Sequence, residues 1–195
     1  MTKQGVEKAN IAFLAVFAAA VVLVSVGGPI HGDATDAERR LDVWDSAPPL
    51  NVAEWIKGPP VQLEEGKGKT VFVVEFWATW CPPCRTSMPH LTEVQEKYKD
   101  RGVVIVGVST EKKETVREFV EGKKKEKIGY RIAVDNNRAT WNAYMKAAGA
   151  PGIPHAFVID KDGRIAWRGH PLDDAFSDVI ERLAFPPKEP ADSQL

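Results

Sequence analysis

Cysteine is almost absent from this chain of 195 residues, which contains only Cys81 and Cys84 in a Trp-Cys-Pro-Pro-Cys stretch. A disulfide framework that staples distant parts of a small secreted domain normally uses several cysteines spread along the chain. A bridge between residues only three positions apart closes a very small loop and constrains little of the unfolded chain. Reactivity of the two thiols therefore explains the pair better than a structural role does.

Histidine is also scarce, and the four residues stand singly at His31, His90, His155 and His170. A structural zinc site built on a Cys-x-x-Cys pair would require a second Cys or His pair at similar spacing. Covalent haem attachment would require histidine directly after the second cysteine, where this chain has Arg85. The formal net charge of −1 gives no overall field that would attract nucleic acid. Redox chemistry of the thiols is the interpretation that remains.

Charge is missing from residues 11–30, and residues 11–24 are apolar throughout. A helix that spans a bilayer needs about 20 predominantly apolar residues. A secretory signal peptide has about 7–15, followed by a small-residue cleavage site, for which residues 25–27 (Ser-Val-Gly) qualify. Residues 1–32 are therefore interpreted as a hydrophobic helix, either an uncleaved membrane anchor or a cleaved signal. Both place the remaining chain outside the cytoplasm, in the periplasm or cell envelope.

The rest of the chain alternates between strand and helix patterns. Residues 70–77 are β-branched and aromatic without strict alternation, as in a strand that is covered on both faces. Further strands are expected at 103–108, 130–134, 155–160 and 164–167, and helices at 85–99, 115–122, 138–148 and, with Asp173 as its cap, up to residue 183. Residues 47–61 are expected to form an extended excursion or hairpin. The sequence thus predicts an α/β fold with a mixed central sheet and helices on both faces. Residues 33–46 are expected to be a linker, 47–184 the domain and 185–195 a tail.

The position of the cysteines suits thiol–disulfide exchange. The thiolate is the attacking species, and Cys81 stands where a buried strand ends and a helix begins. Free N–H groups and the dipole at a helix N-terminus favour negative charge there. Cys84 lies one turn further on, from which it can resolve a mixed disulfide. Pro82 and Pro83 fit the first turn, where their missing N–H groups are not needed.

The segment from Val74 to Arg85 (VEFWATWCPPCR) resembles the active-site segment of the thioredoxin superfamily, in particular the membrane-linked, TlpA-type disulfide reductases of bacterial envelopes. The resemblance extends over residues 47–184 and includes Gly-Ile-Pro at 152–154. Residues 111–150 correspond to an insertion that TlpA-type proteins carry. The resemblance implies a thioredoxin-like fold and no metal or other cofactor.

Roles for several residues follow from that resemblance. Pro154 matches a cis proline beside the cysteine pair, although an ordinary trans turn is the alternative. The backbone of Ile153 would then bind an extended substrate segment, and Trp80, Pro82 and Pro83 would border it. Glu75 matches a buried acid that relays a proton to Cys84; the alternative is a strand-edge glutamate facing water.

The expected function is reduction of disulfides in extracytoplasmic proteins through a Cys81–Cys84 redox-active pair, with a membrane dithiol as the electron donor. Two alternatives stay open. A peroxiredoxin-like peroxidase would place threonine three residues before the cysteine, where this chain has Ala78. A copper-handling binding module would need a third soft ligand, for which Met88 is the candidate. The role of His155, acid–base or packing, also stays open, as do the client protein and the direction of the reaction.

Overall fold

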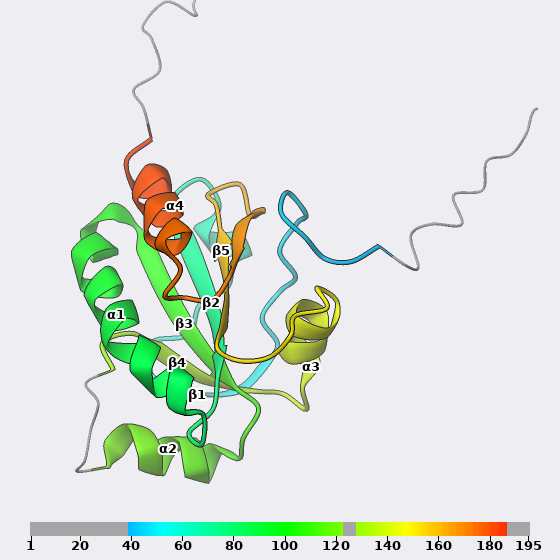
Figure 1. Cartoon of the computed structure of the whole chain (residues 1–195), viewed down its shortest axis with the longest axis vertical. Coiled ribbons are helices and arrows are strands. Elements are labelled where there is room, and N and C mark those ends of the chain that lie inside the picture. Colours follow the sequence, from blue (N-terminus) through cyan, green and yellow to red (C-terminus); the bar gives the residue numbers. More distant parts are fainter. Residues whose placement is uncertain (1–38, 123–127, 187–195) are drawn as a thin grey trace, which may run out of the picture. The chain divides into compact units, whose positions relative to one another are not determined.

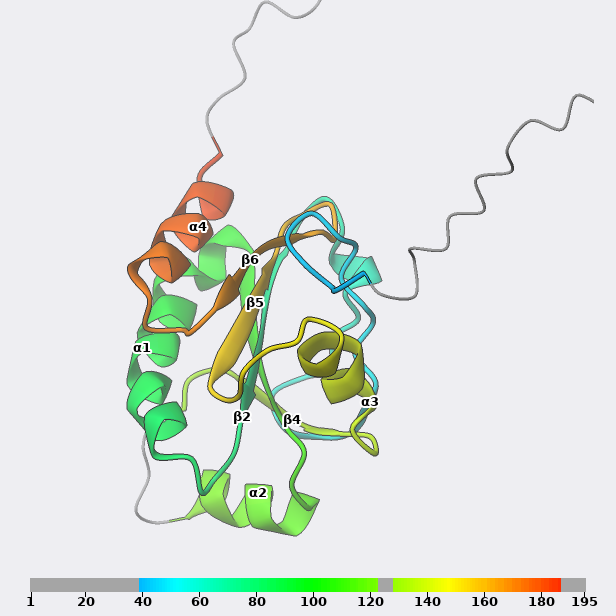
Figure 2. The same cartoon turned by 45° about the vertical axis from the view of Figure 1, so that its right-hand side comes forward.

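A computed structural model describes residues 39–122 and 128–186. They form a six-stranded mixed sheet in the order β1-β4-β3-β2-β5-β6, with helices on both faces (Figures 1 and 2). The neighbours β4, β3 and β2 are parallel, whereas β1 and β5 pair antiparallel with β4 and β2, and β6 with β5. The bounds are β1 Val52–Lys57, β2 Val71–Trp77, β3 Val103–Ser109, β4 Arg131–Asp135, β5 His155–Ile159, β6 Ile165–Gly169, α1 Pro82–Tyr98, α2 Lys113–Glu121, α3 Ala139–Trp141 and α4 Asp174–Ala184, with short helical turns η1 Glu64–Gly66, η2 Lys99–Arg101 and η3 Asn142–Lys146.

Strand β2 lies inside the sheet and all seven of its residues are buried. Val73 and Trp77 belong to the apolar cluster on one face, together with Met88 and Leu91 of α1 and Phe176 of α4. Phe72, Val74 and Phe76 of β2 belong to the cluster on the other face, which includes Tyr144 and Met145 of η3. This double coverage is the reason why the strand is apolar without alternation. The predicted α/β architecture is confirmed.

Of the two forms expected for the segment before β2, an extended excursion and a hairpin, the structure has the extended one. Residues 47–61 do not fold back on themselves; β1 pairs antiparallel with β4, some 80 positions later in the chain. Four of its six residues are partly buried and two are exposed, as is usual for the strand at a sheet edge. The pairing partner could not be inferred from the local pattern because β4 lies in the inserted region.

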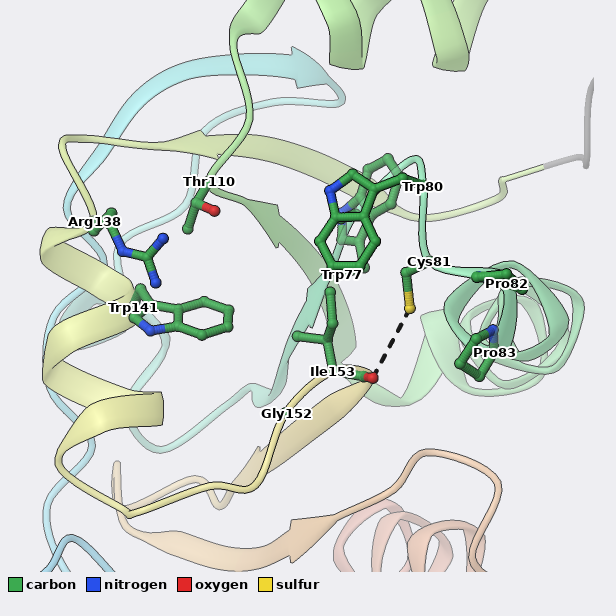
Figure 3. Close-up of a pocket in the computed structure, with 11 residues that line it drawn as sticks. Trp77, Trp80, Cys81, Pro82, Pro83, Thr110, Arg138, Trp141, Gly152 and Ile153 are labelled. Atoms are coloured by element: carbon green, nitrogen blue, oxygen red, sulfur yellow. Dashed lines mark hydrogen bonds between the residues drawn. The ribbon is translucent and has the colours of Figure 1, made fainter.

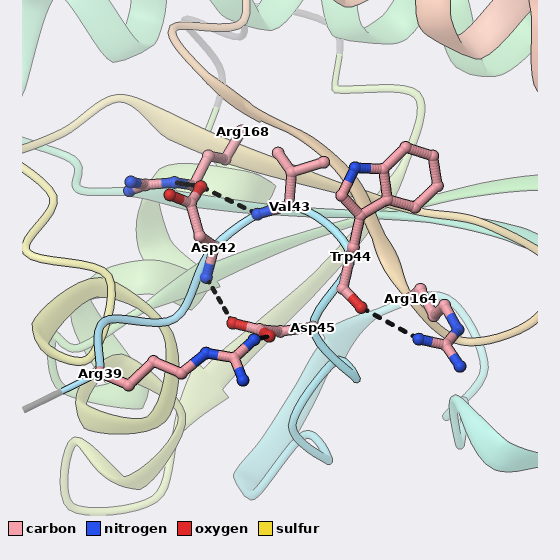
Figure 4. A network of polar contacts seen from close by, with 7 residues as sticks. All are labelled: Arg39, Asp42, Val43, Trp44, Asp45, Arg164 and Arg168. Atoms are coloured by element: carbon pink, nitrogen blue, oxygen red, sulfur yellow. Dashed lines mark hydrogen bonds and ion pairs between the residues drawn. The ribbon is translucent and has the colours of Figure 1, made fainter. Parts of the chain in front are cut away.

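Residues 39–46, expected to be linker, are bonded to the domain (Figure 4). The backbone N–H of Trp44 donates to the Ile165 carbonyl at 2.8 Å, and Arg168 Nε donates to Asp42 Oδ1 at 2.9 Å. Arg39 pairs with Asp45 within the same segment. The ordered domain therefore includes residues before Ala47.

The predicted hydrophobic segment at residues 1–32 lies outside the described residues. Among the residues that are described, no helix is both long and apolar enough to cross a membrane.

The expected side-chain cap of the last helix is wrong. Asp173 occupies the N-cap position of α4, but its carboxylate makes no bond to the helix N–H groups. It instead accepts a hydrogen bond from the backbone N–H of His170 at 3.3 Å. The Asp173 carboxylate thus bonds to the backbone of the turn before α4. Short polar side chains can form such local bonds in place of a helix cap.

Candidate active site

Cys81 and Cys84 lie at the junction between β2 and α1, joined by a disulfide. Cys81 is the N-cap of α1, and Pro82 and Pro83 occupy its first turn as expected. Cys84 is completely buried, whereas Cys81 is slightly exposed and lines a surface pocket. Only the first sulfur is therefore presented to a molecule arriving from outside.

The first turn of α1 is directed at the Cys81 sulfur. The backbone N–H of Cys84 donates to Cys81 Sγ at 3.3 Å. Because the first N–H groups of a helix have no partners within it, an anionic acceptor is favoured at this place by both hydrogen bonding and the helix dipole. After reduction of the disulfide, the same contact stabilises Cys81 as a thiolate, the form that attacks disulfides.

The loop before β5 lies beside this sulfur. The Ile153–Pro154 peptide bond is cis, and the Ile153 carbonyl oxygen is 3.9 Å from Cys81 Sγ (Figure 3). Residues that are 72 positions apart in the sequence thus meet at the site. The expected juxtaposition of the cysteine pair with Ile153 and Pro154 is present.

Glu75 is buried on the same face of the sheet as the cysteines, because it stands two residues from both Val73 and Trp77 along β2, and side chains two residues apart in a strand point to the same face. Its neighbours in the register are Gly107 on β3 and Ala156 on β5, which are small. Neither carboxylate oxygen has a hydrogen-bond partner among the described residues. Burial raises the pKa of Glu75 to about 8. The interpretation as a glutamate facing water is excluded, and the side chain is poised to exchange a proton near neutral pH.

A carboxylate that the sequence did not single out braces the loop before Cys81. Glu111 accepts hydrogen bonds from the backbone N–H and the hydroxyl of Thr79, each at 2.7 Å, and from the Ser109 hydroxyl at 3.1 Å. It follows the end of β3, which runs parallel to β2, so both loops leave the same edge of the sheet. The proximity of Glu111 and Thr79 could have been predicted from the sequence only by assuming that the two strands before them are parallel neighbours.

A pocket of about 450 Å³ opens beside Cys81 (Figure 3). All four residues expected to bind substrate line it, and Trp80 is 70% exposed at its edge. The opposite side is formed by residues that sequence reasoning missed, from the end of β3 and the start of α3. The described residues that line it are Trp77, Ala78, Trp80, Cys81, Pro82, Pro83, Thr110, Arg138, Trp141, Gly152 and Ile153.

His155 follows Pro154 but turns to the other face of the sheet, where its ring packs against Phe157 at 5.1 Å between centroids. Burial, with contributions from the charges of Arg168 and His170, lowers its pKa to about 4. The imidazole is therefore neutral at physiological pH, as a packed histidine would be. Among the described residues, no three His, Cys, Asp or Glu side chains form a group that could hold a metal.

Residues 43–168 match the AhpC/TSA family, and that span includes both cysteines, the cis-proline loop and the pocket. The chain belongs to this family. Within the thioredoxin superfamily it is of the TlpA/ResA type: it is 31% identical to the thiol-disulfide oxidoreductase ResA of Bacillus cereus over 142 residues, which are 72% of this chain and 77% of that protein. ResA of Geobacillus kaustophilus is 32% identical over 146 residues, 74% of this chain and 79% of the relative.

Solved structures of related proteins have the same fold. A thiol:disulfide interchange protein of the thioredoxin family from Chlorobium tepidum superposes with a TM-score of 0.58 at 27% identity, covering 75% of this chain and 98% of that one. A thiol:disulfide interchange protein from a Bacteroides species superposes with a TM-score of 0.61 at 25% identity, covering 76% and 94%. The family and the Cys81–Cys84 pair identify the chain as a thiol–disulfide oxidoreductase.

Proposed function

We propose that the enzyme reduces disulfides of proteins outside the cytoplasm, using Cys81 as the attacking thiolate and Cys84 as the resolving thiol. One observation carries the assignment of roles: Cys81 lines the pocket and accepts the Cys84 N–H, whereas Cys84 is completely buried behind it. An incoming disulfide reaches the first sulfur only.

The reaction balances with two electrons and two protons. The Cys81 thiolate attacks one sulfur of the substrate, a Cys81–substrate disulfide forms, and the other substrate sulfur leaves as a thiolate that takes up a proton. Cys84 then loses its proton and attacks Cys81 Sγ. The second substrate sulfur leaves as a thiolate that also takes up a proton, and the Cys81–Cys84 disulfide closes, as it stands in the structure.

The ionised form of Glu75 is the proposed acceptor of the Cys84 proton, which Glu75 then keeps when the disulfide closes. Its carboxyl lies on the face of the sheet against which Cys84 packs, and its raised pKa of about 8 suits exchange with a thiol near neutral pH. In the oxidised enzyme the buried carboxyl is stable in its protonated form, because desolvation penalises the charge.

Turnover in this direction requires a donor that reduces the Cys81–Cys84 disulfide again. We assign this role to a membrane dithiol and place the domain in the periplasm or cell envelope, attached or delivered by residues 1–32. The support is the uncharged, apolar run at residues 11–24.

Ile153 offers its backbone to the substrate segment beside Cys81, since its carbonyl faces that sulfur.

Trapping with a resolving-cysteine variant tests the proposal. Cys84→Ser leaves the mixed disulfide without its resolving thiol, so substrate proteins should accumulate on Cys81 and appear on a non-reducing gel as adducts that a reductant removes. Cys81→Ser is the matched control and should trap nothing. Adducts that form equally well on Cys84 in the control would refute the assigned roles.

The alternatives give different results in parallel assays. A peroxidase would consume peroxide rapidly with Cys81 alone, but the Thr79 hydroxyl, the group nearest in sequence to a peroxidatic threonine, donates to Glu111. A copper module would bind the metal tightly in the reduced protein, with Met88 as the third ligand; Met88 is buried in the core cluster. If Cys84→Ser traps no substrate protein, rapid peroxide turnover by the wild-type enzyme would favour a peroxidase, and tight copper binding by the reduced protein would favour a copper module.

A further inference from the structure

Arg138 is the one charged residue among those described as lining the active-site pocket; the other residues are apolar apart from Thr110, Gly152 and Cys81. Figure 3 shows its guanidinium on the side opposite Cys81, between Thr110 and Trp141. An otherwise apolar pocket with one cation at its far side is asymmetric. It can orient a bound chain as well as enclose it.

The guanidinium of Arg138 is held in place by an aromatic ring. It lies over the ring of Trp141, with Cζ 4.7 Å from the ring centroid. Stacking on an aromatic face leaves the N–H groups in the guanidinium plane free to bind a planar anion with two hydrogen bonds. Within residues 39–122 and 128–186, no carboxylate forms an ion pair with Arg138.

The nearest acid in the sequence is already used. Asp135 ends β4, and its two carboxylate oxygens accept hydrogen bonds from the backbone N–H groups of Thr140 at 2.9 Å and Trp141 at 2.8 Å. These bonds fix the start of α3, and with it the ring on which Arg138 stacks. Arg138 itself has left-handed backbone torsions, with φ +63°, at the N-cap of that helix. The arginine is therefore presented by a braced turn and stays available to a ligand.

We infer that Arg138 binds a carboxylate on the substrate, so that the enzyme prefers disulfides whose cysteine is followed or preceded at short range by an aspartate or glutamate. This inference rests on the proposed function, because the ligand is the polypeptide whose disulfide Cys81 attacks. The apolar part of the pocket accepts the chain beside the cysteine, and the arginine at the far side selects the acidic neighbour. Arg138 is then a specificity-determining residue and takes no part in the electron transfer.

Rates of reduction with matched peptides test the inference. Each peptide carries a single cysteine in a mixed disulfide whose cleavage is followed by fluorescence, with both ends blocked. One series places glutamate and the other glutamine at each position up to three residues from the cysteine. The reduced full-length enzyme should react with the best glutamate peptide roughly two- to fivefold faster than with its glutamine partner, the range that exposed ion pairs support. The preference should shrink in 1 M salt.

Variants assign the preference to its residue. Arg138→Gln should abolish it by slowing the glutamate peptide alone, and Arg138→Lys should retain part of it. Arg101→Gln is the matched control, since Arg101 also stacks on an aromatic ring, 4.6 Å over Phe185, away from the pocket. It should behave as wild type in both series. A third peptide, with glutamine and a free C-terminal carboxylate, distinguishes an acidic side chain from a chain end.

The outcomes separate the two claims. Equal rates for glutamate and glutamine peptides at every position, or a preference that survives in Arg138→Gln, would overturn the inference while leaving the reductase in place. A preference for the free chain end alone would also overturn it. Failure of the wild-type enzyme to reduce any peptide would instead count against the proposed function.

Discussion

Glu111 accepts two hydrogen bonds from Thr79, one from its backbone N–H and one from its hydroxyl, each at 2.7 Å. Thr79 stands two residues before Cys81 in the loop that joins β2 to α1. The contact joins this loop to the segment that follows β3, the strand next to β2 in the sheet. The loop that leads to Cys81 is thus held by a residue outside the Cys-Pro-Pro-Cys motif.

Glu111→Ala should destabilise the protein by about 1–2 kcal/mol, because partly buried donors on Thr79 lose a charged acceptor. Urea unfolding of the oxidised protein measures this. Thr79→Val removes only the hydroxyl bond and should cost less, and the double variant should show a coupling energy between the two residues. Strict additivity of the two single effects would show that the contact is not a stabilising one.

The buried Glu75 predicts a pH dependence of stability. Its pKa in the folded protein is about 8, raised by burial from 4.5. The stability that comes from keeping it protonated is fully present below pH 4.5 and is lost as the pH rises through about 8. With about 1.4 kcal/mol for each pKa unit, the loss is on the order of a few kcal/mol.

Urea unfolding of wild type and Glu75→Gln at pH 5, 7 and 8.5 measures the loss. The amide keeps the shape and cannot titrate, so the variant should gain on wild type as the pH rises. Glu65→Gln, at an exposed glutamate, is the control and should follow wild type at every pH. Parallel curves for wild type and Glu75→Gln would contradict a buried, titrating carboxyl.

The hydrogen bonds of Asp135 to the start of α3 lead to a prediction about stability. Its carboxylate accepts the N–H groups of Thr140 and Trp141, so Asp135→Ala leaves the start of α3 without these acceptors. A loss of about 1 kcal/mol in the free energy of unfolding is expected, as for other helix caps. Asp174→Ala is a suitable comparison, at an exposed first-turn position of α4. An effect of Asp135→Ala no larger than that of Asp174→Ala would contradict the capping role.

The central fold was predicted well from the sequence where the residues of a single strand or helix show a clear apolar or helical pattern. The apolar stretch that became β2, the helix after the cysteines and the strand–turn–strand unit of β5 and β6 were expected at nearly their observed bounds. Pairing over long distances was not predicted: residues 47–61 were expected to form an extended excursion or a hairpin, without a distant partner, and β1 pairs with β4. Nor was docking of residues 39–46, because its hydrogen bonds join the backbone to a distant strand.

The candidate site was predicted for the residues that carry a motif. Cys81, Cys84 and Pro154 meet as expected, and Glu75 is buried on the expected face. Arg138, Trp141 and Glu111 belong to the inserted region, where a single arginine or glutamate looks like any exposed charge in the sequence. Only the parallel arrangement of β2, β3 and β4, which gathers the loops after these strands at one edge, brings them to the cysteines.

Reduction of the Cys81–Cys84 disulfide in redox buffers of defined potential tests the central claim most directly. Trp80, exposed at the edge of the same pocket, provides a fluorescence signal. The account predicts a two-electron transition with a midpoint closer to that of thioredoxin, about −270 mV, than to that of the oxidant DsbA, about −120 mV. The transition should disappear in Cys81→Ser. A midpoint near the DsbA value, or no titration of the pair, would contradict a disulfide reductase.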